Sequence, residues 1–198
     1  MHTIKFFESI SVIIASIAAI WGIASWRKET RWKRKYELAE EVLSCFYETH
    51  QIIRNIRSPF GFSGEGEAYR KEADFLTNNH AYDRFYVIRE RYEKNKTAFE
   101  KLQVLKFRFI AVFGKKYEKP FHELISIMNE IFNASRRQGM ILAERRGPMV
   151  SGFRSNELKE IEDIIYEKLG SNPDQMETRV QDAVSEIEQV CRKIIGKK

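Results

Sequence analysis

Hydrophobic and polar positions follow a helical period through most of this chain. No glycine or proline occurs between Gly22 and Pro59, and apolar residues recur there at steps of three and four, the spacing of one helix face. This stripe consists of Ala39, Val42, Phe46, Ile53 and Ile56. It predicts one long helix that begins near Phe7 and ends near Arg57, because the residue before a proline disfavours helical geometry.

Further helices are predicted beyond a loop at 58–66, which holds three glycines and a proline. The helical patterns cover 67–75, 81–113, about 25 residues from Pro120, 158–169 and a final segment that reaches Ile194. Leu105, Phe107 and Phe109 alternate with cations, which also fits a short strand, although the surrounding period is helical. Gly114 ends the second pattern, and a second loop covers 147–155.

The final helix has the clearest signals. Asn172 is the predicted cap and Pro173 occupies the first helical position. The stripe of this helix consists of Val180, Val184, Ile187, Cys191 and Ile194. We expect it to pack on the stripe between Ala39 and Ile56 or on a partner protein. Together these patterns predict an all-α fold in which 36–198 forms an antiparallel helical bundle.

The segment 9–26 contains 18 residues without a charge. A helix that crosses the hydrocarbon core of a membrane needs about 20 apolar residues, so this segment predicts a transmembrane helix. The dense cations after it predict that 1–8 lies outside and that the bundle is cytoplasmic, as in a single-pass protein of a plasma membrane. A cleaved signal peptide and a buried helix of a soluble core are the alternatives.

Small residues within this segment recur at steps of four. They are Ser11, Ala15 and Ala19. Small residues at that spacing let two helices approach closely, so the sequence predicts a self-association face here. The alternative is that small residues are common in such segments.

Charge is concentrated directly after the apolar segment. The chain has a net charge of +6, and 27–35 contributes six cations and one anion, or +5. The cations are Arg27, Lys28, Arg31, Lys33, Arg34 and Lys35. We call 27–35 the basic collar and predict that it contacts anionic lipid headgroups. Since 36–198 is nearly neutral, we expect no nucleic-acid partner.

The remaining candidates for chemistry are few. Arg136, Arg137, Arg145 and Arg146 form two pairs that could bind an anion or an acidic partner, or could match the dipole of a helix end. No nucleophile with a base at a known spacing, no metal site and no cofactor motif is predicted. Cys45 and Cys191 fall on apolar helix faces, which predicts buried free thiols.

Four short segments carry a resemblance. They are Ile56-Arg57-Ser58-Pro59-Phe60, Gly64-Glu65-Gly66, Tyr92-Glu93-Lys94-Asn95 and Phe113-Gly114. Over roughly 37–145 the chain resembles uncharacterised bacterial proteins with one N-terminal membrane span and a helical cytoplasmic region. The resemblance implies a bacterial inner membrane and no particular activity.

Three functions are compatible with these features. The first is an interaction or scaffolding module, with a protein partner or self-association, which is not an enzyme. The second is an oligomerising membrane effector triggered through the bundle. The third is an enzyme acting on anionic substrates near the membrane through the arginine pairs.

Overall fold

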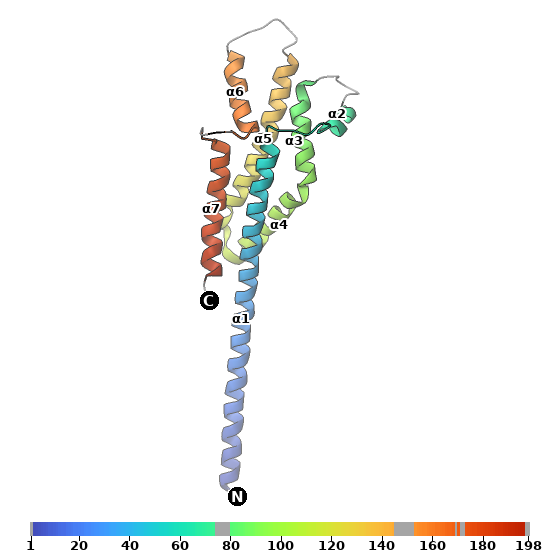
Figure 1. The fold of residues 1–198 in the computed structure, drawn as a ribbon. Helices are drawn as coiled ribbons and strands as arrows, with labels where there is room; N and C mark the ends of the chain where they lie inside the picture. Colours follow the sequence, from blue (N-terminus) through green and yellow to red (C-terminus); the bar gives the residue numbers. More distant parts are fainter. Residues whose placement is uncertain (1, 74–79, 145–152, 169, 171–172, 197–198) are drawn as a thin grey trace.

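The fold is described by a computed structural model. It covers residues 2–73, 80–144, 153–168, 170 and 173–196, and for 2–15, 71–73, 144 and 153–155 it describes the backbone alone. Within these residues all regular structure is helical, which confirms the all-α prediction. One long helix, α1, projects from a body formed by the remaining helices (Figure 1).

The long first helix is confirmed. α1 (His2–Arg57) is a continuous helix of 56 residues, or about 84 Å at 1.5 Å per residue. From Leu38 onward its apolar stripe lies in the core. Before that point the helix leaves the body and carries the N-terminus far from it (Figure 1). α1 therefore has two parts, one that packs in the core and one that projects from the body.

The predicted membrane helix is contradicted. Among the residues whose side chains are described, no helix has a segment long and apolar enough to cross a membrane. The predictions of a transmembrane helix at 9–26 and of a single-pass inner-membrane protein are therefore wrong.

The body is built from shorter helices. They are α2 (Glu67–Ala73), η1 (His80–Tyr82), α3 (Asp83–Lys94), α4 (Lys96–Phe113), η2 (Lys115–Tyr117), α5 (Lys119–Glu144), α6 (Phe153–Ile165) and α7 (Gln175–Ile195). α1 packs against α7 and α4, and α5 packs against α3, α6 and α7. Residues 105–109 are helical, so the alternative of a short strand is excluded there.

Two boundaries differ from those predicted. The single helix predicted over 81–113 is broken at Asn95, whose side-chain Nδ2 donates to the carbonyl of Arg91 over 2.8 Å. Asparagine competes in this way with the helix hydrogen bonds. The cap of α7 is Asp174, which accepts from the backbone N–H of Glu177 over 3.0 Å. The predicted cap, Asn172, lies outside the described residues.

The core lies between α1, α4, α5 and α7. Phe46, Phe109 and Phe121 come from three of these helices and are fully buried, with the rings of Phe46 and Phe121 edge to face at 4.8 Å. Full burial of one such ring stabilises the fold by about 1.5–3 kcal/mol. The α7 stripe also faces this core, and Val180, Val184, Ile187 and Cys191 are buried. Packing of α7 on α1 is thus confirmed.

α5 passes close to η1 at Gly139. A Cβ atom at Gly139 would overlap the ring of Tyr82, so the ring lies directly against the α5 backbone. A glycine in the interior of a helix costs about 1 kcal/mol relative to alanine. Here the missing side chain makes room for packing between two segments that are distant in sequence.

A buried arginine joins three helix ends. The Arg57 side chain is 1% exposed and its Nη1 lies 3.0 Å from Oδ2 of Asp174. Its guanidinium also donates to the carbonyls of Asp163, Ile164 and Tyr166 at the end of α6, over 3.0, 2.9 and 2.6 Å. These carbonyls have no partner within the helix. Arg57 therefore binds the end of α1 to the end of α6 and, through Asp174, to the start of α7.

A second buried arginine holds the loop after α1. Arg91 of α3 makes a two-pronged ion pair with Glu65, with both N–O distances at 2.7 Å. It also donates to the carbonyls of Asn55, Ser58 and Phe60 over 2.8, 2.9 and 2.6 Å. The chain from the last turn of α1 to Glu65 is thus ordered around one guanidinium.

These two ion pairs predict loss of stability in acid. Hydrogen bonds from Arg91 lower the pKa of Glu65. Burial opposes ionisation of Asp174, but the N–H groups of Lys168 and Glu177 together with Arg57 outweigh it and lower its pKa. Carboxylates with lowered pKa values stabilise the fold fully above their ordinary values, near pH 4, and this contribution is lost as the pH falls through the lowered values.

We therefore expect the free energy of unfolding in urea to fall between pH 5 and pH 2. The fall should be shallower in Asp174→Asn and Glu65→Gln, which cannot ionise at those positions. An unfolding free energy in both variants that depends on pH as steeply as in the parent would contradict the assignment.

Candidate functional site

The projecting part of α1 carries a group of exposed large apolar side chains. Its large side chains are 53–78% exposed. They are Ile17, Ile20, Trp21, Ile23 and Trp26. Proteins rarely expose several large apolar side chains next to one another, and such patches usually mark an interaction site. We call residues 16–26 the apolar arm.

The basic collar continues the arm toward the body. Arg27, Lys28, Arg31, Lys33, Arg34 and Lys35 are all exposed. Arg31 donates to the carbonyl of Arg27, and Lys33 lies 4.0 Å from Glu37, which follows the collar. The structure places the collar on the projecting part of α1 and does not test the predicted contact with headgroups.

The predicted small-residue face falls mostly outside the described side chains. Ala19 is exposed on the arm. Ser11 and Ala15 lie in the part of α1 for which only the backbone is described. Self-association through this face therefore stays a prediction.

An ordered loop presents two aromatic side chains. Phe60 and Phe62 are 71% and 87% exposed, although the surrounding backbone is fixed by Arg91 and Glu65. The N–H of Phe62 donates to Oε2 of Glu65, and the N–H of Glu65 donates back to the carbonyl of Phe62. The sequence showed the loop through its glycines, but only the buried Arg91 reveals that it is ordered.

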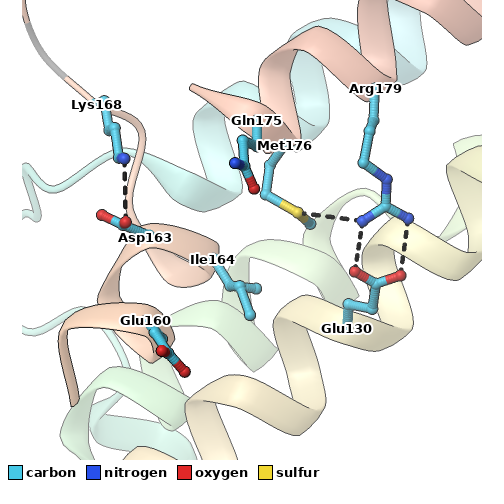
Figure 2. Close-up of a pocket in the computed structure, with 8 residues that line it drawn as sticks. All are labelled: Glu130, Glu160, Asp163, Ile164, Lys168, Gln175, Met176 and Arg179. Carbon is cyan, nitrogen blue, oxygen red and sulfur yellow. Dashed lines mark hydrogen bonds and ion pairs between the residues drawn. The ribbon is translucent and has the colours of Figure 1, made fainter. Parts of the chain in front are cut away.

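A polar pocket of about 420 Å³ lies between α5, α6 and α7. It is lined by Glu130, Glu160, Asp163, Ile164, Lys168, Gln175, Met176 and Arg179. Figure 2 shows that the two cations point at carboxylates rather than into open space. Arg179 makes a two-pronged pair with Glu130 at 2.6 and 2.8 Å, and Nζ of Lys168 lies 3.0 Å from Asp163.

This pocket has little capacity for catalysis. No histidine, cysteine or serine lines it, so it offers no nucleophile with an adjacent base. Hydrogen bonds from Arg179 lower the pKa of Glu130, which makes that carboxylate a weaker base. Three carboxylates against two cations disfavour an anionic substrate. The charged residues that line the pocket form ion pairs, and the pair between Arg179 and Glu130 joins α7 to α5.

The structure describes one of the two arginine pairs. Arg136 is exposed, and Arg137 on α5 donates from Nε to Glu157 on α6 over 2.8 Å. A hollow of about 330 Å³ beside Arg137 is lined by Glu130, Glu157 and Glu160, whose charge opposes a bound anion. Arg145 and Arg146 lie outside the described residues. An anion or partner patch formed by both pairs stays a prediction.

The remaining polar candidates hold helices together. Nε2 of His50 on α1 lies 2.7 Å from Glu177 on α7.

Cys45 and Cys191 are fully buried free thiols, as predicted, and burial raises the pKa of Cys191 to about 12. A thiol with so high a pKa is a poor nucleophile near neutral pH. The described residues contain no group of three or more potential ligands that could hold a metal ion.

Comparison of the chain with known protein families, curated proteins and solved structures finds no match. The arm, the collar and the Phe60–Phe62 loop are the features that internal packing does not account for.

Proposed function

We propose that this protein is an interaction module, in which the helical body anchors α1 and the apolar arm binds another protein. One observation carries the proposal: five large hydrophobic side chains on the arm are more than half exposed. Burying an apolar side chain of this size against a partner stabilises a complex by about 1.5–3 kcal/mol before the costs of association.

The attachment of the arm supports this proposal. α1 has no described break between the arm and the core, and its last residue, Arg57, is buried among three helix ends. A helix fixed in this way presents its side chains with little loss of conformational freedom on binding. The body therefore holds α1 in a fixed position, and the arm is a preformed binding element.

The alternatives have less support. An enzyme on anionic substrates would need unpaired cations beside a general acid or base. The described cations around the polar pocket and around the hollow beside Arg137 are paired with carboxylates instead. An interaction module requires only the exposed apolar arm and its rigid support.

Site-specific photo-crosslinking tests the proposal. A photoreactive phenylalanine analogue at Trp21, in the full chain in cells, should give covalent adducts with protein. The same group at Glu93, an exposed position on α3, is the matched control and should give few. Equal yields at the two positions, or no adduct at Trp21, would contradict binding through the arm.

A further inference from the structure

The large apolar side chains of the arm, from Ile17 to Trp26, are more than half exposed. α1 is straight and directed away from the body (Figure 1), so its side chains cannot fold back onto the core. At 100° per residue, Ile17 and Trp26 lie on opposite sides of the helix, and Ile20, Ile23 and Trp21 lie between them on both flanks. A helix that is apolar on several sides is normally buried among other helices.

We propose that the charge-free segment 9–26, which contains the arm, packs antiparallel against the same segment of a second copy of this chain. This inference rests on the proposed function, for which it names the partner. The charge-free segment 9–26 brings no like charges together when two copies meet. Two such helices pack at an interaxial distance of about 8–10 Å.

The basic collar determines the direction of pairing. In a parallel pair, two collars of net charge +5 would lie side by side within about one Debye length, and like charges at that distance repel. In an antiparallel pair centred on 9–26, each collar lies opposite 1–8 of the other copy. That segment carries only Lys5 and Glu8, which sum to zero.

The sizes of the side chains also favour the antiparallel direction of pairing. Both tryptophans of the segment, Trp21 and Trp26, lie in its second half. Its first half contains aliphatic and small residues only. An antiparallel pair places each tryptophan opposite that first half, whereas a parallel pair would stack the four large rings at one end. The two bodies then lie at opposite ends of the paired helices.

Distance measurement between spin labels tests the arrangement. Glu40 is exposed on α1, and Glu40→Cys can be labelled in the full chain because Cys45 and Cys191 are fully buried. An antiparallel pair centred on 9–26 places the two labels about 70 Å apart at 1.5 Å per residue. A parallel pair would place them within about 30 Å, the interaxial distance plus two label linkers.

The molar mass in solution and two variants complete the test. We expect an even number of copies, the long label distance, and a monomer for Ile20→Lys, which buries a charge in the pair. Glu37→Lys, exposed on the same helix outside the apolar segment, is the control and should still pair.

A short distance, an odd number of copies or a monomeric parent would each overturn the antiparallel pair. If the parent is monomeric but Trp21 still crosslinks to a different protein, this inference fails and the proposed function stands. Absence of any adduct at Trp21 would remove both.

Discussion

Replacing Arg91 with methionine should lower the free energy of unfolding by about 3–5 kcal/mol. The Arg91 side chain is 5% exposed, and its removal leaves the carboxylate of Glu65, itself 10% exposed, without its cation. The carbonyls of Ser58 and Phe60 lose their donors as well. Urea unfolding followed by circular dichroism measures the change.

An exposed ion pair provides the control for the Arg91 prediction. Arg108 also pairs across helices, with Glu41 over 2.9 Å, but both side chains are well exposed. Arg108→Met should therefore change stability by only about 1 kcal/mol or less. Adding Glu65→Leu to Arg91→Met should recover part of the loss, because the buried charge is then removed. Equal effects of Arg91→Met and Arg108→Met would show that burial does not determine the role of Arg91.

Arg57→Met is expected to have a second large effect, again about 3–5 kcal/mol. The substitution leaves Asp174 buried without its cation and removes the donors to the carbonyls of Asp163, Ile164 and Tyr166. The damage should concentrate where α6 ends and α7 begins. Hydrogen exchange should show faster exchange at 166–168 and 174–178, in addition to the lower unfolding free energy.

The neighbouring Arg54 provides the control for Arg57. It lies one turn earlier on α1 and pairs with Glu167 over 2.8 Å, but its side chain is 46% exposed. Arg54→Met should cost about 1 kcal/mol or less and leave exchange at the start of α7 nearly unchanged. If Arg54→Met and Arg57→Met behave alike, Arg57 does not join the three helix ends in the way its contacts indicate.

The sequence by itself determined the local elements. Helical period over Ala39–Ile56 and Val180–Ile194 was sufficient to predict α1 and α7 and their buried faces, because side chains three and four residues apart share a face. The stop at Pro59 and the end of α4 at Gly114 followed from backbone chemistry. Burial of Cys45 and Cys191 followed from their place in these stripes.

The tertiary structure decided what local pattern cannot encode. Arg54 and Arg57 look alike in sequence, yet one is half exposed and the other is buried against Asp174. The break at Asn95 and the overlap of Tyr82 with Gly139 depend on which helices meet. The sequence predicted a membrane helix at 9–26, and the described part of α1 contradicted it.

These outcomes share one physical reason. Periodicity reports which residues share a helix face, and this information is carried by neighbours along the chain. Burial of a charge, order in a loop and exposure of an apolar arm depend on contacts between segments 30 to 110 residues apart, as for Arg91 with Asn55 and Arg57 with Ile164. Only the folded arrangement of α1, α3, α6 and α7 fixes those contacts.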